Sequence, residues 1–142
     1  MNKISRTLAQ IRELSVILGW DPEDVFMSGE CGSLALLMKE IFKEIHIYGL
    51  YFGFELQHIL IYYDGVYYDI NGEFTIYKFV KQFNKKVGYK ILKEKNFHIG
   101  ENELTQNEIY MCCGNYSKLA GNVFDSQMEI SNLYKLLKNR LE

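Results

Sequence analysis

The amino-acid sequence predicts a single α+β domain in which a helix carrying Cys31 packs on an antiparallel sheet. Apolar side chains recur every three or four residues near both ends of the chain, which is the period of an amphipathic helix. Between residues 46 and 71 aromatic and β-branched residues dominate, as they do in strands. No repeat, low-complexity tract or proline-rich linker divides the 142 residues, so we expect one domain over residues 1–142.

Composition and charge narrow the possible functions. The formal net charge of −2 gives no basic surface for a phosphate backbone, so we expect no nucleic-acid partner. No apolar run is long enough to span a bilayer and no secretion signal is recognisable, so we expect no membrane partner. The odd count of three cysteines, two of them adjacent at Cys112 and Cys113, favours a reduced, cytoplasmic setting.

Helical periodicity is clearest in the first third of the chain. Residues 2–18 place apolar side chains on one face with Gly19 just past the end, and Asp21 and Pro22 suit the start of a short second helix. A third helix should begin near the capping residue Ser28, because apolar residues again form one stripe: Leu34, Leu37, Met38, Ile41 and Phe42. Since its first half is apolar nearly all round, we expect this helix to be central and buried.

From residue 46 the pattern becomes that of strands. Segments at 47–54, 58–63 and 66–71 predict three antiparallel strands, and Asp64-Gly65 is a strong signal for a two-residue hairpin turn. Thr75 can cap a helix that ends at Gly88. Residues 89–92 and 97–99 are expected to pair as another hairpin, residues 103–113 fit either a helix or a strand, and residues 126–141 predict a helix that opens with a capping box.

Cys31 is the residue whose position suggests chemistry. It falls in the first turn of the predicted central helix, and helix N-termini favour the thiolate, which is the nucleophilic form of cysteine. Backbone N–H groups beside it are candidate donors to an oxyanion. Glu30 opposes a thiolate by like charge unless it points away, so a basic partner is needed, and His58 can supply it.

The geometry of the predicted hairpin indicates a third residue for the site, one that orients the His58 imidazole. If Asp64-Gly65 forms a two-residue turn, Leu60 faces Asp69 and His58 faces Asn71. Alternate residues share a face, so Asp69 becomes the diagonal neighbour of His58 and can orient its imidazole. Asn71 is the alternative orienting residue, and Asp69 is preferred because it carries a charge.

The chain resembles the papain-like superfamily of cysteine hydrolases in one stretch. There, residues 29–35 begin a helix, His58 follows in a strand, and Asp69 follows after the hairpin turn. Its transglutaminase-like and bacteriocin-leader-peptidase-like branches share the order Cys, His, Asp, and the resemblance covers residues 28 to 72. It implies a papain-like domain with Cys31, His58 and Asp69 as catalytic residues. Two features depart from the pattern, because the interval between Cys31 and His58 is short and no glutamine precedes Cys31 to complete the oxyanion hole. Gln57 should point to the opposite face from His58.

Each candidate also has a structural interpretation. Cysteine is often a small buried apolar residue, so Cys31 alone proves nothing. His46 and His98 are expected to be surface or half-buried strand residues. Cys112 and Cys113 could join other ligands around zinc, but adjacent cysteines lack the usual spacer, so no metal is expected.

The sequence therefore predicts a cysteine-dependent hydrolase or acyltransferase that acts on an amide or ester bond, in the manner of a peptidase, amidase or deamidase. The substrate would be a protein, a peptide or a small amide, and no cofactor is required. Hydrolysis, deamidation and acyl transfer share every step up to the acceptor, so all three remain open. The alternative class is a non-catalytic binding or inhibitory protein that holds a partner on an aromatic-rich sheet.

Overall fold

The structure is a computed structural model that describes residues 2–19, 21–27, 31–88 and 92–111, together with Lys135 and Asn139. The predicted helix over residues 126–141 lies outside the described residues, apart from Lys135 and Asn139, which are both helical. Ser28 and Glu30 also lie outside them, as do Cys112 and Cys113.

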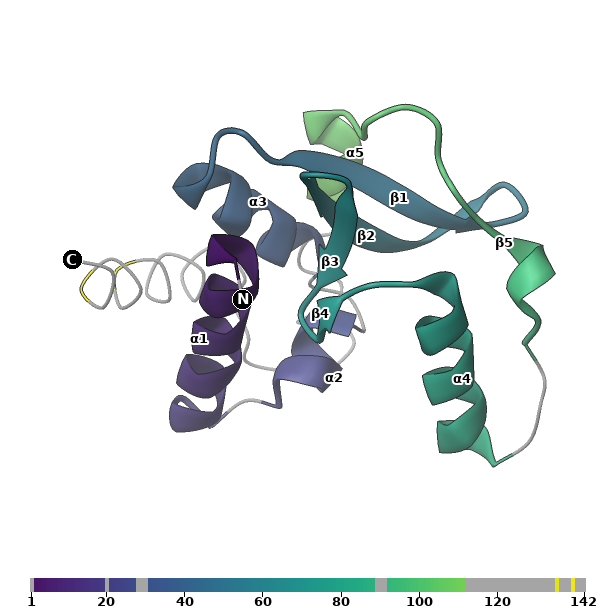
Figure 1. Ribbon diagram of the computed structural model, residues 1–142, viewed down its shortest axis with the longest axis horizontal. Helices are drawn as coiled ribbons and strands as arrows, with labels where there is room; N and C mark the ends of the chain where they lie inside the picture. Colours follow the sequence, from purple (N-terminus) through teal and green to yellow (C-terminus); the bar gives the residue numbers. More distant parts are fainter. Residues whose placement is uncertain are drawn as a thin grey trace.

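The described chain folds as an α+β protein (Figure 1). The helices are α1 (Lys3–Ile17), α2 (Pro22–Met27), α3 (Cys31–Ile41), α4 (Ile76–Val87) and α5 (Gln106–Met111), with a short 3-10 turn at Glu94–Asn96. The strands are β1 (His46–Phe52), β2 (Glu55–Tyr63), β3 (Val66–Asp69), β4 (Gly72–Glu73) and β5 (Phe97–Ile99). They form one antiparallel sheet in the order β4-β3-β2-β1-β5. The predicted α+β class, with the Cys31 helix packed on an antiparallel sheet, is confirmed.

The main core lies between the first helix, the central helix and one face of the sheet. Asn2 caps α1 by accepting the Ser5 N–H at 2.9 Å, and this fixes the start of the helix. The core side chains are fully or almost fully buried; they are Ile4, Leu8, Ile11 and Leu14 of α1, Leu34, Leu37 and Met38 of α3, and Ile61, Tyr68 and Ile70 of the sheet region. Their spacing is the one that the sequence predicted for two amphipathic helices.

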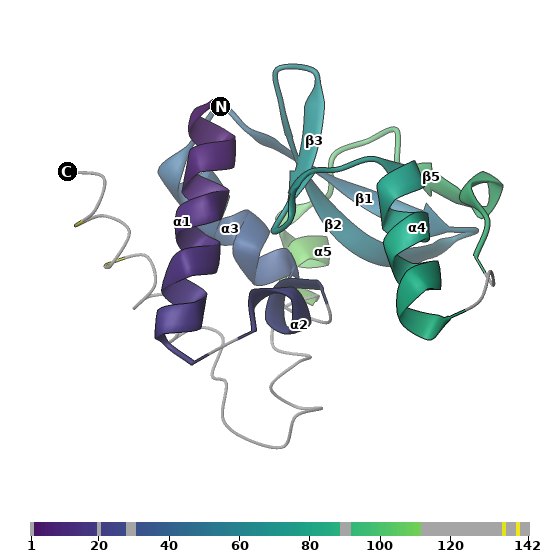
Figure 2. The same cartoon turned by 60° about the horizontal axis from the view of Figure 1, so that its bottom comes forward.

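The two faces of the sheet carry different helices. Ile59 and Ile61 of β2 pack with residues of α3, whereas the intervening Leu60 packs with Phe74, Val80 and Phe97 on the side of α4. Successive strand residues point to opposite faces, so α1 and α3 cover one face and α4 covers part of the other (Figure 2). His58 shares its face with Leu60, which places it toward α4.

The hairpin between β2 and β3 has the predicted register. Tyr63 pairs with Val66, and both turn residues have positive φ, 51° at Asp64 and 83° at Gly65, as a type I′ turn requires. The predicted third strand, however, ends at Asp69 and not at residue 71. The chain turns there, because Asp69 pairs with Gly72 across a second tight turn, and Gly72 adopts a φ of 102° that favours glycine.

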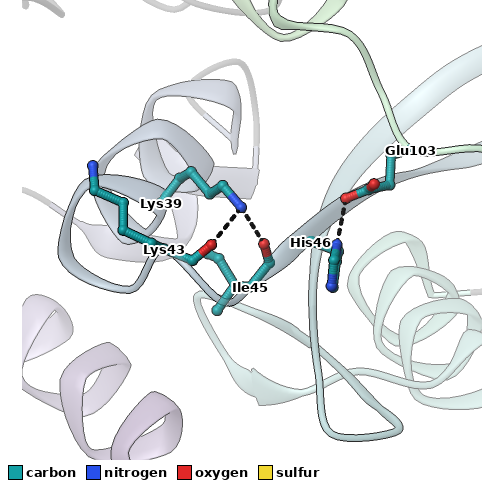
Figure 3. A network of polar contacts seen from close by, with 5 residues as sticks. All are labelled: Lys39, Lys43, Ile45, His46 and Glu103. Carbon is teal, nitrogen blue, oxygen red and sulfur yellow. Dashed lines mark hydrogen bonds and ion pairs between the residues drawn. The ribbon is translucent and has the colours of Figure 1, made fainter.

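A polar network fixes the central helix to the sheet (Figure 3). The Lys39 ammonium near the end of α3 donates to the carbonyl oxygens of Lys43, at 2.8 Å, and of Ile45, which satisfies carbonyl groups in the connection to β1. His46 at the start of β1 pairs through Nδ1 with the Glu103 carboxylate at 2.7 Å. The network therefore holds α3, β1 and the segment before α5 together.

Two predictions for the second half of the chain need correction or completion. Phe97–Ile99 is a strand that pairs with β1, while residues 89–91 of its expected partner lie outside the described residues. The backbone N–H and carbonyl of Leu92 are both hydrogen-bonded to the Asn84 side chain of α4, at 3.0 and 3.1 Å. These two groups are therefore not available for backbone pairing with a strand. The ambiguous stretch from residue 103 becomes helical at Gln106, where α5 starts beside the Thr105 cap.

Candidate Cys-His-Asp site

Cys31 is the first residue of α3 as described, and the sequence had placed it in the first turn of a helix that begins near Ser28, which lies outside the described residues. The first N–H groups of a helix have no acceptor within the helix, and they favour negative charge nearby. The residue is 8 % exposed and packs among the apolar side chains of Ala35, Ile59 and Leu104. Cys31 therefore lies in a mainly apolar setting with a small opening to solvent.

His58 and Asp69 meet across the hairpin in the predicted diagonal arrangement. His58 Nε2 lies 3.2 Å from Asp69 Oδ2, and the two residues are only 2 % and 5 % exposed. The other carboxylate oxygen, Oδ1, accepts the Asn71 backbone N–H at 2.8 Å. Asp69 contacts the imidazole, while Asn71 lies in the turn and orients the carboxylate. Of the two orienting residues that the sequence left open, the structure brings Asp69 to His58.

The second imidazole nitrogen, Nδ1, is the one that does not contact Asp69. It is buried and has no hydrogen-bond partner among the described residues. Interaction with the Cys31 thiol contributes to the raised pKa of His58. Because Nε2 contacts Asp69, Nδ1 is the nitrogen that remains available to a further partner.

The pKa of His58 reflects this arrangement. Burial lowers it, but the hydrogen bond with Asp69 and the interaction with Cys31 outweigh burial and raise the pKa from 6.5 to about 9. The imidazole is therefore protonated at neutral pH, with both ring nitrogens acting as donors.

Two aromatic side chains that sequence reasoning did not assign to the site border the imidazole. The Phe79 ring on α4 lies nearly parallel to it, with centroids 6.0 Å apart and planes at 17°, and the Phe74 ring lies 6.2 Å away at 51°. Both residues line a hollow of about 320 Å³ that reaches Asp69. The helical period after Thr75 was the available signal, because it places Phe79 on the apolar face of α4.

The other sequence candidates lie away from the site. Gln57 is exposed and its amide lies 3.5 Å from the Glu55 carboxylate, so it points away from His58 as expected. His46 pairs with Glu103, and His98 stacks on Tyr51 with ring centroids 5.5 Å apart, so both histidines are surface strand residues as predicted. Within the described part of the chain no group of three His, Cys, Asp or Glu is placed to hold a metal ion.

The fold is that of an α+β protein, with a buried His58–Asp69 pair on a β-hairpin and Cys31 in the central helix. A family model described as Phage YunG-like protein matches residues 4–110, and the chain belongs to the Phage YunG-like family. The match spans Cys31, His58 and Asp69. No curated protein and no solved structure matches the chain.

This family assignment corrects the resemblance noted in the sequence. The expectation of a papain-like domain is wrong, because the family that matches is Phage YunG-like and not a papain-like cysteine hydrolase family. The resemblance rested on residue types and their order over residues 28 to 72. A helix start followed by a hairpin can bring cysteine, histidine and aspartate together in that order in any fold, so the order does not specify a family. In the described ranges of the chain, no helix is both long and apolar enough to cross a membrane.

Proposed function

We propose that the protein is a cysteine-dependent hydrolase or acyltransferase that acts on an amide or ester bond. Cys31 is the nucleophile, His58 the general acid and base, and Asp69 the residue that orients and charges His58. The single observation that carries this proposal is the buried imidazole that contacts the Asp69 carboxylate at 3.2 Å and interacts with the Cys31 thiol. A nucleophile, a base and an orienting group in contact are the signature of covalent catalysis.

The reaction follows from the charges of the three groups. The Cys31 sulfur attacks the carbonyl carbon of the substrate, and an S–C bond forms as the carbonyl oxygen becomes negative. The His58 imidazolium gives its proton to the leaving amine or alcohol, the C–N or C–O bond breaks, and a thioester remains. His58, now neutral, takes a proton from water or an acceptor amine, which attacks the thioester. The product acid or amide leaves and the thiolate is restored.

The surroundings of Cys31 support this chemistry. The N–H groups of Cys31 and Gly32 at the start of α3 are candidate donors to the developing oxyanion. Apolar neighbours such as Ile59 and Leu104 lower the local dielectric, which strengthens each charge interaction at the site. Substrates of this site would be proteins, peptides or small amides, and the mechanism requires no cofactor.

Selective alkylation tests the proposal. Iodoacetamide is added to the protein across about pH 5 to about pH 9, where an ordinary thiol becomes a thiolate only near the upper end, and labelled peptides are identified by mass spectrometry. We expect Cys31 to react faster than Cys112 and Cys113 at the acid end of this range. His58→Ala should slow Cys31 by about tenfold or more, since the imidazolium that stabilises the thiolate is gone.

His46→Ala is the matched control, because it also removes a strand histidine that pairs with a carboxylate, but at the surface. It should leave the rate at Cys31 unchanged. Equal, slow labelling of all three cysteines in the wild-type protein would remove the basis for a nucleophile at this site. So would a His58→Ala variant that reacts as fast as the wild type.

One observation favours the second class of function, a binding or inhibitory protein. Tyr48, Tyr62 and Tyr67 pack against one another on adjacent strands of the sheet, with ring centroids 5.0 to 5.9 Å apart, and all three are partly exposed. Partly exposed tyrosines offer apolar area and a polar tip to a partner. The alkylation result separates the two functions, because a binding protein has no need of a reactive Cys31.

A further inference from the structure

The Phe79 side chain extends from α4 to the imidazole of the candidate site. Its ring lies nearly parallel to that of His58 at a centroid distance of 6.0 Å, which is an offset stack. The Phe79 ring also packs edge-on against the Phe97 ring, with centroids 5.5 Å apart and planes at 75°. It packs at a tilt against the Phe74 ring, with centroids 6.0 Å apart and planes at 50°. Phe79 is therefore fixed from two further directions and forms a stable surface for the imidazole.

The stacked Phe79 ring restrains rotation of the His58 imidazole about its bond to Cβ, which the hydrogen bond with Asp69 alone defines only weakly. An imidazole can turn about its bond to Cβ, and a rotation would withdraw Nε2 from Asp69 and Nδ1 from the thiol at the same time. A flat ring parallel to the imidazole blocks that rotation sterically. Phe79 also lines the hollow of about 320 Å³ on the side of α4, whereas His58 is not among the residues that line it.

We propose that Phe79 is a positioning residue that holds the His58 imidazole in the orientation that contacts Asp69 and Cys31 together. The inference rests on the proposed function of the site. It makes α4, which contributes no reacting atom, part of the catalytic arrangement. The ring of Phe79 covers the face of His58 on the side of α4.

Charged groups near the imidazole do not provide an alternative restraint. Among the described residues, Asp69 and Cys31 are the titratable groups that contribute to the pKa of His58. The hollow beside Asp69 is lined by Glu73 of β4 and by Lys78, Lys81 and Lys85 of α4, which are exposed at its rim. The lysines have the same sign as the imidazolium and would repel it, so on the α4 side the contact that retains the ring is aromatic packing.

The test compares Phe79→Leu with Phe79→Tyr. Leucine keeps apolar bulk and therefore the fold, but it removes the flat ring. Tyrosine keeps the flat ring, and Phe79 is one of the residues that line the hollow. Phe83→Leu is the control, because Phe83 is on the same helix, is 38 % exposed and has no ring contact with His58. Circular dichroism confirms that each variant is folded, and Phe79→Met replaces Phe79→Leu if the leucine variant is not.

Two readouts are measured, the iodoacetamide rate at Cys31 at neutral pH and the NMR signal of the hydrogen-bonded Nε2 proton of His58. In Phe79→Leu we expect the rate to fall about tenfold, since only molecules with the bonded orientation carry the ion pair, and the Nε2 proton signal to broaden or vanish. Phe79→Tyr and Phe83→Leu should behave like the wild type.

The outcomes distinguish the two proposals. If wild-type Cys31 reacts rapidly and folded Phe79→Leu keeps both the rate and the Nε2 proton, the positioning role is refuted and the catalytic proposal stands. If wild-type Cys31 reacts no faster than an ordinary thiol, the catalytic proposal fails and the positioning role for catalysis fails with it.

Discussion

The charge of Asp69 should account for much of the proton affinity of His58. The pKa of His58 is raised from 6.5 to about 9 although burial lowers it, and the hydrogen bond with Asp69 is the first contribution that opposes burial. A shift of this size corresponds to about 3 kcal/mol in favour of the imidazolium. Asp69→Asn keeps the shape and a hydrogen-bond acceptor but removes the charge. We therefore expect the pKa of His58 to fall by about 1 to 3 units in this variant.

The assay is an NMR titration of the His58 ring signals from about pH 5 to about pH 10, which brackets the ordinary and the raised pKa. Glu73→Gln is the control, since Glu73 is also a carboxylate that lines the hollow beside Asp69, but it is exposed. The control should leave the midpoint near that of the wild type. An Asp69→Asn midpoint that stays near 9, or an equal shift in Glu73→Gln, would show that the hydrogen-bonded carboxylate is not what raises the pKa.

Three further predictions concern stability. The pKa of His58 in the folded protein, about 9, exceeds its ordinary value of 6.5, so the stabilising contribution of His58 is complete below pH 6.5 and is lost as the pH rises through 9. The Tm of the wild type should therefore fall more between about pH 7 and about pH 10 than the Tm of Asp69→Asn. Parallel curves of Tm against pH would contradict this. Gly49→Ala should reduce the free energy of unfolding in urea by about 1–3 kcal/mol, because the new Cβ would meet Leu56 Cδ1 at 2.5 Å, and an unchanged midpoint would mean that Leu56 moves aside freely. Thr75→Ala should lower the free energy of unfolding in urea by about 1 kcal/mol, because it removes the helix cap in which Thr75 Oγ1 accepts the Lys78 N–H at 3.1 Å. An unchanged free energy of unfolding would mean that water replaces the cap.

The local features of the fold were predictable because their causes are local. The cap at Thr75, the left-handed Gly88 and the Asp64-Gly65 turn each depend on a few adjacent residues. The partner of Phe97–Ile99 was not predictable in this way, because strand pairing depends on which sheet edge is open after the other strands have paired. The bond between Leu92 and the Asn84 side chain is likewise a contact that no periodicity reveals.

The candidate site was predictable where it depends on which strand residues share a face of the sheet. A two-residue turn fixes which residues of the hairpin share a face, so the contact between His58 and Asp69 could be deduced from residue numbers. The end of β3 at Asp69 was not deduced, and for that reason Asn71 had been placed in a strand opposite His58. Phe79 was predicted as part of a helix face, but its contact with the imidazole required the position of α4 relative to the sheet. The family could not be deduced from the order of Cys31, His58 and Asp69, since unrelated folds can share that order.

The cluster draws its members from both sides of the sheet. Cys31 packs among residues on the side of α3, while His58 is stacked against α4 on the other side. In a partly unfolded molecule in which α4 has come away, His58 would lose its stacking contact with Phe79. Under the proposed function and the positioning role proposed for Phe79, the full reactivity of Cys31 would then require α4 to be in place.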